Sequence, residues 1–476
     1  MRESWTPKPA DRVVRHPRED DIQPIRLTIT PRRVPSKFTA TPLLMVYTFL
    51  GFIAVGTLLL LLPFTHHGPG FTPFMTALFT STSAITVTGL VVEDTALYWT
   101  RFGQVVILGL IYVGGLGFMT TATFMMILIG QRVTLAQRLL VRESLMINQL
   151  GSMVRLTVGI VIVATLIQVV GFLALFGRFF FMYPAPEAVW QAAFHAVSAF
   201  NGAGFVVLRE VDQLLAFRGD TLIMGTMAAL IFIGALSYLV IIDLVRLRKF
   251  ALFTLNTKLV LVMTLALTLI AIVGFLLAEY SNVDTLGPLS IKDKVVSSIF
   301  QGISMRTAGF TIAELNYANP HTNVLTSVLM FIGGASASVA GGLKVNTLAI
   351  ILLSVIALVR GRNNVSAFGR ELPASLVQRA MVLGTVSIAF MFFVVLLLTI
   401  SESTAGLNEI LFEAASAFGT VGLSIGLTPN LSVMGEWIII VTMFIGKLGP
   451  LTIGLTMAQR SERDLYRYPQ ERVTIG

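Results

Sequence analysis

The stretch Thr86-Val87-Thr88-Gly89-Leu90 decides the fold, because the chain repeats its design four times. Each copy is a Gly-centred turn after a short apolar segment, and the turns are Thr86-Val87-Thr88-Gly89, Asn201-Gly202-Ala203-Gly204, Arg306-Thr307-Ala308-Gly309 and Gly419-Thr420-Val421-Gly422. We number them first to fourth. Their last glycines lie 115, 105 and 113 residues apart, and such near-equal spacing indicates an internal repeat. Four similar turns predict four backbones that meet around one axis.

The composition is that of a membrane protein. Of the 476 residues, 55% are hydrophobic and 12% are charged, and the mean hydropathy is +0.82. Soluble domains of this length are not so apolar, so we expect a polytopic chain in a lipid bilayer. The net charge of +9 is explained by basic cytoplasmic loops, and no nucleic-acid partner is expected. The sequence has no cysteine, which excludes disulfides and thiolate metal sites.

Long apolar runs flank each turn and are the expected membrane spans. The eight runs lie near 42–63, 103–130, 153–177, 220–245, 256–278, 322–359, 379–400 and 434–457. The segments before the turns, near 71–83, 187–200, 293–304 and 407–418, are too short to cross about 30 Å of hydrocarbon at about 1.5 Å per residue. We expect each of them to be a re-entrant half-helix that enters the membrane and turns back.

The predicted fold class is therefore an all-α polytopic membrane protein. Four pseudo-repeats of helix, re-entrant pore loop and helix surround one central pore. The expected division is a basic N-terminal tail (1–40), the four repeats (41–131, 150–248, 254–360 and 377–458) and a C-terminal tail (459–476).

Charge predicts the orientation. Basic residues gather in the linkers and the C-terminal tail, at Arg132, Arg138, Arg142, Arg155, Arg246, Arg248, Lys249, Arg360, Arg362, Arg370, Arg379, Arg460, Arg463 and Arg467. Acidic residues gather at the opposite ends of the spans, at Glu93, Asp94, Glu210, Asp212, Glu279, Asp284, Glu314 and Glu402. By the positive-inside rule, both termini are expected in the cytoplasm and the turns open from outside.

The turns favour a site for a monovalent cation. Backbone that enters a membrane without forming a helix must line a cavity or be buried in protein. Rings of carbonyl oxygens can replace the hydration shell of K⁺, and glycine reaches the positive φ that such a turn requires. The turns carry no ring of carboxylates of the kind that suits divalent cations.

The second span of each repeat contains a further recurring glycine, at Gly114, Gly234, Gly333 and Gly446. Close helix packing is one explanation, and a shared position that faces the centre is the other. In the third repeat the glycines continue into the break 333–346, whose small residues do not sustain a firm helix.

These residues resemble the Trk/Ktr/HKT superfamily of potassium transporters, most closely the membrane subunit of bacterial Ktr systems. The resemblance covers about residues 40–460 and rests on SAITVTGL (83–90), SAFNGAGF (198–205), MRTAGF (305–310), SAFGTVGL (416–423), GGASASVAGGLK (333–344) and MFIGKLGPLT (443–452). It implies that the sixteen residues of the four turns form the K⁺ filter. Gly89 matches the potassium-permeable pattern. Gly202 replaces the usual Asn, which is expected to widen or loosen the second turn.

The resemblance also implies a gate. The break corresponds to an intramembrane gating loop that includes Gly333, Gly334, Ser336, Ser338, Gly341 and Gly342, with a simple kink as the alternative. The pore-lining Arg of the family falls at Lys447, for which a snorkelling side chain is the alternative. Arg306 is expected to fold away from the axis and to bond an acid or a carbonyl. His195 is expected to be packed rather than to bind a metal.

The function that follows is passive K⁺ uptake across the bacterial plasma membrane. The resemblance implies a homodimer in which the C-terminal Gly476 inserts into its partner, stimulation by Na⁺, and control by a cytoplasmic ring of nucleotide-binding RCK subunits. No cofactor is expected in this chain. A symporter coupled to H⁺ or Na⁺, or a Na⁺-conducting relative, is the alternative, although neither Asp243 nor Glu413 is a convincing coupling group. An enzyme is not expected, because no paired carboxylates or nucleophile–base pair stands out at membrane depth.

Overall fold

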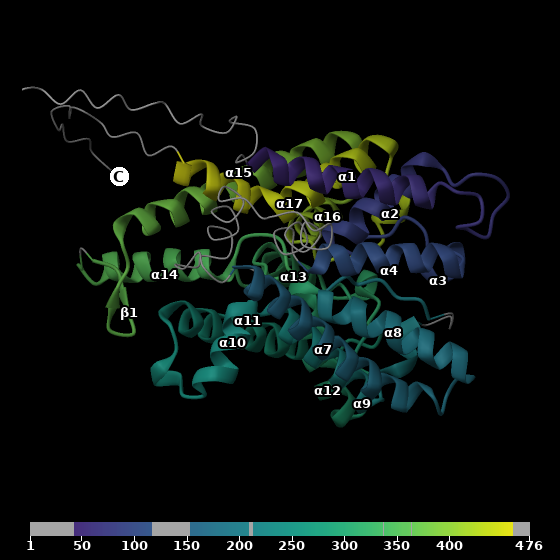
Figure 1. The fold of residues 1–476 in the computed structure, drawn as a ribbon, viewed down its shortest axis with the longest axis horizontal. Coiled ribbons are helices and arrows are strands. Elements are labelled where there is room, and N and C mark those ends of the chain that lie inside the picture. The colour runs from purple at the N-terminus through teal and green to yellow at the C-terminus, as the bar shows by residue number, and fades with distance from the viewer. Residues whose placement is uncertain (1–41, 117–152, 209–212, 337, 363, 460–476) are drawn as a thin grey trace, which may run out of the picture. The chain divides into compact units, whose positions relative to one another are not determined.

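Long apolar helices begin each repeat and carry exposed apolar surface. They are α1 (Pro42–Leu60), α7 (Met153–Phe179), α11 (Leu255–Glu279) and α15 (Ala374–Ser401). A computed structural model describes residues 42–116, 153–208, 213–336, 338–362 and 364–459 (Figure 1). Within them, α7, α11 and α15 are long and apolar enough to cross a membrane. Only 28–39% of an apolar 18-residue stretch in each of these helices is buried inside the protein. The remaining apolar surface suits contact with lipid.

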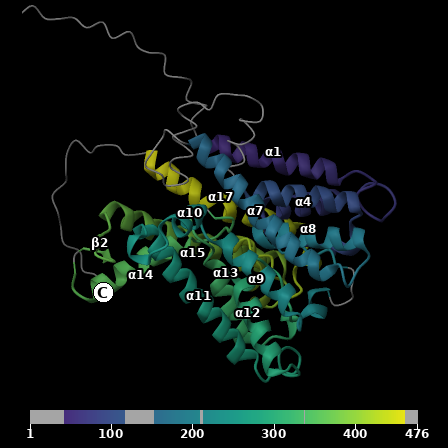
Figure 2. The same ribbon diagram turned by 60° about the horizontal axis from the view of Figure 1, so that its bottom comes forward.

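A short helix follows each long one and leads into a turn. These helices are α2 (Phe74–Thr86), α8 (Ala185–Asn201), α12 (Ile291–Thr307) and α16 (Leu407–Gly419), and they correspond to the four expected half-helices. Each packs against the long helix before it, as α11 and α12 show in Figure 2. The short helices also contact the preceding repeat: α4 packs on α8, α9 on α12, α13 on α16 and α17 on α2. Packing therefore runs around a closed circle in chain order.

The second helices are less regular than the sequence predicted. They are α4 (Arg101–Gly115), α9 (Thr221–Ala235) with α10 (Tyr238–Leu247), α13 (Pro320–Phe331) with α14 (Val345–Val359), and α17 (Val433–Gln459). The span predicted near 220–245 is bent, because α9 and α10 meet at 101°. At the bend, the Ser237 hydroxyl caps α10 by accepting from the amide of Leu239 at 3.3 Å. The predicted interruption after 332 is confirmed.

The remaining elements are small. They are α3 (Thr95–Tyr98), a hairpin of β1 (Ser366–Ala367) and β2 (Arg370–Glu371), and the 3₁₀ turns Gln213–Phe217, Phe250–Leu252, Leu315–Tyr317 and Thr428–Asn430. The N-terminal tail, the linker 117–152 and the residues after 459 lie outside the described part of the chain. The predicted orientation and repeat boundaries stay predictions.

In every repeat, the end of the first helix is bonded to the start of the second. In each case the residue that precedes the second helix meets the end of the first. The pairs are Thr100 Oγ1 to the Phe64 carbonyl (2.8 Å), Arg178 Nε to Asp220 Oδ2 (2.5 Å), the Asn319 amide to Glu279 Oε1 (2.9 Å) and Ser432 Oγ to Glu402 Oε1 (2.5 Å). The four pairs differ in their chemistry but occupy the same place in the repeat, and each joins the two helices between which the short helix and its turn lie.

Asp220 offers a test of these ties. Its carboxylate caps α9 by accepting from the amides of Leu222 (3.0 Å) and Ile223 (3.1 Å). We expect Asp220→Ala to lower the free energy of unfolding by about 1–2 kcal/mol, since a cap contributes about 1 and an exposed ion pair less. Asp220→Asn, which keeps the cap and loses the charge, is expected to cost less than about 1 kcal/mol. Thermal unfolding in detergent checks both, and equal losses would contradict the capping role.

The pH dependence of this tie has a definite sign. Partial burial acts to raise the pKa of the Asp220 carboxyl, but the hydrogen bonds from Arg178, Ile223 and Leu222 outweigh it and lower that pKa. The contribution to stability is therefore present above about pH 4 and is lost as the pH falls through the folded value.

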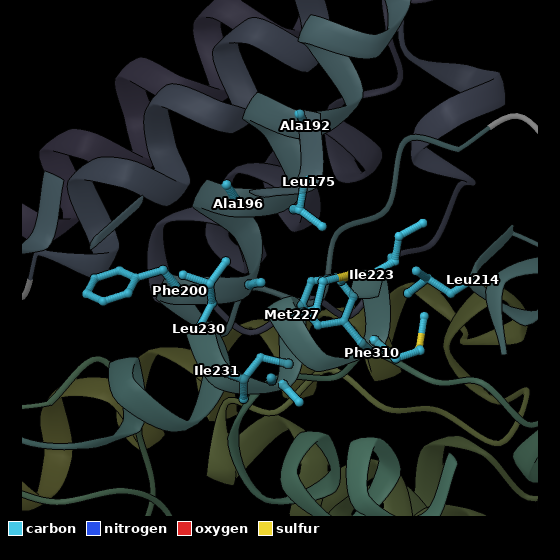
Figure 3. Packing of buried hydrophobic residues seen from close by; sticks show 14 of the residues in the cluster. Leu175, Ala192, Ala196, Phe200, Leu214, Ile223, Met227, Leu230, Ile231 and Phe310 are labelled. Atoms are coloured by element: carbon cyan, nitrogen blue, oxygen red, sulfur yellow. The ribbon is translucent and has the colours of Figure 1, made fainter. Parts of the chain in front are cut away.

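The largest hydrophobic core joins the second repeat to the third turn. Leu175 of α7, Ala192 and Ala196 of α8 and Met227 of α9 pack together with every side chain buried (Figure 3). Phe310, the residue after the third turn, inserts its ring into the same cluster. The small alanines allow α8 to lie close to its neighbours, so the core fixes the turns as well as the helices.

Candidate functional site

The four turns lie side by side in a closed ring. Their last glycines all have positive φ, with values of +90° at Gly89, +70° at Gly204, +73° at Gly309 and +96° at Gly422. A Cβ atom at each would meet the carbonyl oxygen that precedes the next glycine: Ala203, Ala308, Val421 and, closing the circle, Thr88. Each backbone therefore touches the next in chain order, and glycine is required both for the backbone angle and for the space.

The serine that anchors each turn was not singled out from the sequence. Every short helix contains a buried Phe followed four residues later by a buried Ser, at Phe79–Ser83, Phe194–Ser198, Phe300–Ser304 and Phe412–Ser416. Two of the hydroxyls accept from turn glycines, Ser83 from Gly89 and Ser416 from Gly422, both at 3.0 Å. Those of Ser198 and Ser304 donate to the carbonyls of Phe205 (2.9 Å) and Phe310 (2.6 Å). The recurring Phe-x-x-x-Ser was the signal in the sequence.

The third turn has a different geometry from the others. The helices α2, α8 and α16 end in left-handed residues, Val87, Gly202 and Thr420, whereas α12 continues through Thr307. Ala308 then has φ −135°. The cause lies in the sequence, where four residues rather than five separate the anchoring serine from the glycine.

The break in the third repeat is a folded loop rather than a simple kink. Residues 332–344 separate α13 from α14, and the two ends of the loop pair where Gly333 donates to the Leu343 carbonyl at 2.9 Å. The loop touches the fourth turn, since the Gly341 amide donates to Thr420 Oγ1 at 2.9 Å. Gly342 also donates to the Gly446 carbonyl of α17 at 3.0 Å. The loop therefore reaches from the broken helix to the ring of turns.

Residues 28–467 match the family model for TrkH, described as cation transport protein. The chain belongs to this family. It is 40% identical over 440 residues to Ktr system potassium uptake protein B of Bacillus subtilis (strain 168), covering 92% of this chain and 97% of the relative. Potassium/sodium uptake protein NtpJ of Enterococcus hirae is 34% identical over 456 residues, which cover 94% and 100% of the two chains. The resemblance noted from the motifs is confirmed.

The fold agrees with a solved member of the TrkH family. The crystal structure of the potassium transporter TrkH from Vibrio parahaemolyticus matches with a TM-score of 0.69, over 90% of this chain and 87% of that one. At 18% sequence identity, this likeness concerns the fold alone. Together with the apolar helices, it supports a polytopic membrane protein.

Gly202, the departure from the family pattern in the second turn, has a steric explanation. Its φ of +64° matches +56° at Val87 and +50° at Thr420, so the helix ends in the same way and is not widened there. A Cβ at Gly202 would stand 2.5 Å from the Thr307 carbonyl oxygen. Glycine thus removes the strain of a left-handed residue and lets the second turn approach the third.

Arg306 bonds a hydroxyl and two backbone carbonyls, where an acid or a carbonyl was expected. Its guanidinium is buried and donates to Thr268 Oγ1 (2.8 Å) and, at longer range, to the carbonyls of Thr264 (3.4 Å) and Gly333 (3.5 Å). The first two belong to α11 and the third begins the loop. His195 is packed, since its ring lies edge-on to Phe179 and Phe194.

Two lysines hold neighbouring carbonyls of the loop. The Lys447 ammonium of α17 donates to the carbonyl of Val339, and the Lys344 ammonium donates to that of Ala340. Lys447 therefore faces the loop, and the snorkelling alternative does not describe it. Of the predicted loop residues, Ser336 donates its amide to Asn346 Oδ1 at 3.2 Å and Gly334 accepts from the amide of Val345 at 3.0 Å.

The recurring glycines of the second helices serve close packing in three repeats. A Cβ at Gly114, Gly234 or Gly446 would overlap the carbonyl of Ile85, Phe200 or Phe418, which lies in the short helix of the same repeat. Gly333 instead lies against the carbonyl of Gly341 within the loop. The packing explanation therefore accounts for these positions in the first, second and fourth repeats.

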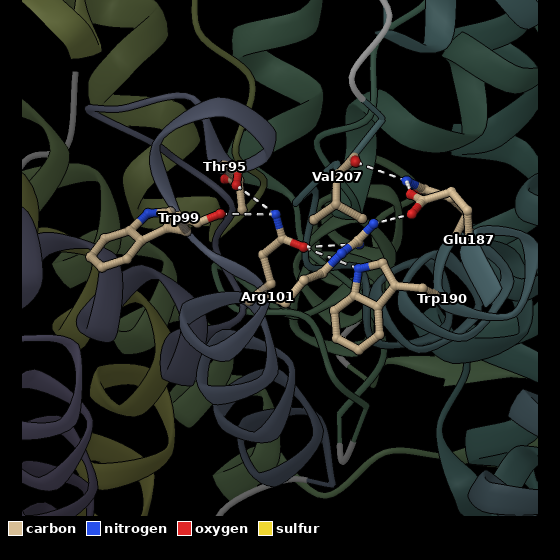
Figure 4. A network of polar contacts seen from close by, with 8 residues as sticks. Thr95, Trp99, Arg101, Glu187, Trp190 and Val207 are labelled. Carbon is tan, nitrogen blue, oxygen red and sulfur yellow. Dashed lines mark hydrogen bonds and ion pairs between the residues drawn. The ribbon is translucent and has the colours of Figure 1, made fainter. Parts of the chain in front are cut away.

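A polar network braces the first two repeats beside their turns (Figure 4). Arg101 at the start of α4 forms an ion pair with Glu187 of α8 and lies over the ring of Trp190, 5.4 Å from its centroid. Gln191 connects Glu187 (2.7 Å) to the carbonyl of Val207 (3.0 Å), three residues past the second turn. The network fixes the backbone that leaves the ring.

Proposed function

We propose that this chain carries K⁺ into the bacterial cell through a gated, channel-like pore. The sixteen residues of the four turns form its selectivity filter. The observation that carries the proposal is the closed ring of glycine turns, in which each glycine adjoins the carbonyl of the next turn. Stacked carbonyl oxygens replace the hydration shell of a monovalent cation. The name of the 40% identical relative, a potassium uptake protein, supports K⁺ as the ion.

The transport is passive in this proposal. The membrane potential supplies about 2.3 kcal/mol per charge for each 100 mV, which suffices to concentrate K⁺ without hydrolysis of ATP. The sequence contains no G-x-x-x-x-G-K-[ST] motif that would hold a nucleotide in this chain. The protein acts as a transporter rather than an enzyme.

The loop 333–346 is the gate, with Gly333, Gly334, Ser336, Ser338, Gly341, Gly342 and Lys447 as its working residues. Its contact with Thr420 of the fourth turn supports a position across the ion path. Arg306, bonded to Gly333, joins the third turn to the start of the loop. Opening requires the loop to leave these partners.

The relatives support an assembly around this subunit. Three of them are named as parts of a Ktr system, which favours a complex with regulatory partners. We propose a homodimer in the plasma membrane with both termini in the cytoplasm, a cytoplasmic RCK ring that binds nucleotide, and stimulation by Na⁺. The basic linkers, among them Arg246, Arg248 and Arg360, are the proposed docking surface.

A Na⁺-conducting or cation-coupled transporter is the second candidate. The observation that favours it is the 34% identical relative, which is named a potassium/sodium uptake protein.

The two candidates are separated by fluxes into liposomes that contain the purified full chain, with K⁺ or Na⁺ as the sole permeant cation. The proposal predicts K⁺ flux that exceeds Na⁺ flux at least about tenfold, a difference of about 1.4 kcal/mol between the two barriers. It also predicts no dependence on a proton gradient. Equal fluxes, or flux that requires a pH gradient, would favour the second candidate.

A further inference from the structure

In each short helix, the residue directly after the recurring Phe is a buried polar side chain. The four are Thr80, His195, Gln301 and Glu413, and at most 2% of any of them is exposed. They occupy one position in the four repeats and differ in chemistry. The last two reach beyond the turn: Gln301 Oε1 accepts from the Ile312 amide at 3.2 Å, and Glu413 accepts from residues after the fourth turn.

Glu413 is hydrogen-bonded to two residues of the segment 423–428, which follows the fourth turn. Its carboxylate accepts from Ser424 Oγ at 2.8 Å and from the hydroxyl of Thr428. Ser424 Oγ in turn accepts from the amides of Gly426 (3.2 Å) and Thr428 (3.4 Å). Glu413 therefore bonds Ser424 and Thr428 directly, and through Ser424 it is linked to the backbone of residues 426 and 428, shortly after Gly422 of the ring.

Burial of the Glu413 carboxyl costs more free energy than a side chain that only filled the space would cost. A fully buried carboxyl loses its hydration, and a well-packed apolar residue of the same size would avoid that loss. In the described part of the chain, no basic side chain forms an ion pair with Glu413. In the other described repeats, neutral Gln301 and packed His195 stand at the same position without a carboxylate.

We infer that Glu413 is a positioning residue for ion selectivity. Through Ser424 and Thr428 it fixes the backbone after Gly422, and so it fixes the fourth side of the ring against Thr88 and Gly89 of the first turn. This inference rests on the proposed function. Selectivity depends on the positions of the carbonyl oxygens in all four turns. A change in the backbone position of one turn therefore changes the preference between K⁺ and Na⁺.

The test compares Glu413→Ala with Glu413→Gln in the full chain. Glutamine can bond both hydroxyls, whereas alanine bonds neither. We expect Glu413→Ala to reduce the K⁺/Na⁺ flux ratio in liposomes about tenfold, the equivalent of one hydrogen bond to a charged group, and Glu413→Gln to stay within about threefold of the wild type. The thermal midpoint in detergent, measured in KCl and in NaCl of equal strength, gives a second readout, because a bound ion stabilises the fold.

A matched control is Glu402→Ala. Glu402 is also a buried carboxyl, but it ties the outer ends of α15 and α17 through Ser432. We expect its loss to lower both thermal midpoints equally and to leave the flux ratio unchanged. A purely structural role of Glu413 would give this same pattern. If Glu413→Ala does not fold, Ser424→Ala and Thr428→Val remove the donors one at a time, and the same fall in the ratio is expected.

The outcomes separate this inference from the proposed function. A wild type without preference for K⁺ would overturn the proposed function, and this inference with it. A selective wild type, together with a folded Glu413→Ala variant of the same flux ratio and the same difference between the KCl and NaCl midpoints, would overturn the inference alone.

Discussion

Replacing Gly422 by alanine is expected to abolish selective K⁺ flux. The φ of +96° at this glycine lies outside the range that residues with a Cβ adopt without strain. A Cβ there would overlap the Thr88 carbonyl and the backbone of Gly89. Either the fourth turn moves or the first does, and the ring opens at the place where it closes. We expect the K⁺/Na⁺ flux ratio in liposomes to fall at least about tenfold, since a left-handed Ala alone costs about 1–2 kcal/mol.

Gly369→Ala is the matched control for this substitution. Gly369 also has a positive φ, +75°, but it lies in the hairpin of β1 and β2 and a Cβ there would meet nothing within 4 Å. It therefore imposes the backbone strain without the collision, and the flux ratio is expected to stay at the wild-type value. A folded Gly422→Ala variant that keeps its preference for K⁺ would show that the ring is not the filter.

The ring was predictable because it depends on a local requirement of the backbone, and the residues that meet this requirement recur four times in the sequence. A turn that needs positive φ selects glycine wherever it occurs, so Gly89, Gly204, Gly309 and Gly422 stand out at near-equal intervals. The short helices were predictable for a related reason, since their apolar segments are too short to cross the bilayer. Both features need no knowledge of distant contacts.

The features that were missed depend on partners far along the chain. The apolar run continues through residues 236–245, so hydropathy gives no sign of the bend. At the bend, the carbonyl of Ala235 accepts from the amide of Ala335, in the third repeat, at 3.2 Å, and this contact with a distant part of the chain is not visible in the sequence. Glu413 was weighed only as a coupling group and was set aside because it was placed near the outer half of its repeat. Its bonds to the hydroxyls of Ser424 and Thr428 were missed, because only the fold brings these partners to the carboxylate.

Shortening the loop is expected to raise K⁺ flux more than any other change. The structure shows how to do so, because the ends of the loop already touch: Gly333 donates to Leu343 at 2.9 Å and Val345 donates to Gly334 at 3.0 Å. Replacing residues 335–342 by two glycines therefore removes the contacts with Thr420 and Gly446. The hydrogen bonds that join the two ends of the loop remain. We expect flux to rise with the K⁺/Na⁺ ratio unchanged, since the ring keeps its four turns.

Lys447→Ala tests the same loop more mildly, because it removes one contact of the loop and leaves the loop itself in place. A hydrogen bond from a charged donor contributes about 1.5–3 kcal/mol, so losing the bond to Val339 is expected to raise the open population and the flux by about 10–100-fold. Lys344→Ala is the control, because Lys344 bonds Ala340 within the loop itself and does not tie the loop to α17. Its effect is expected to be smaller. Unchanged flux in both the shortened-loop and the Lys447→Ala variants would contradict the gating role of the loop. The barrier to ion flow would then lie elsewhere on the path.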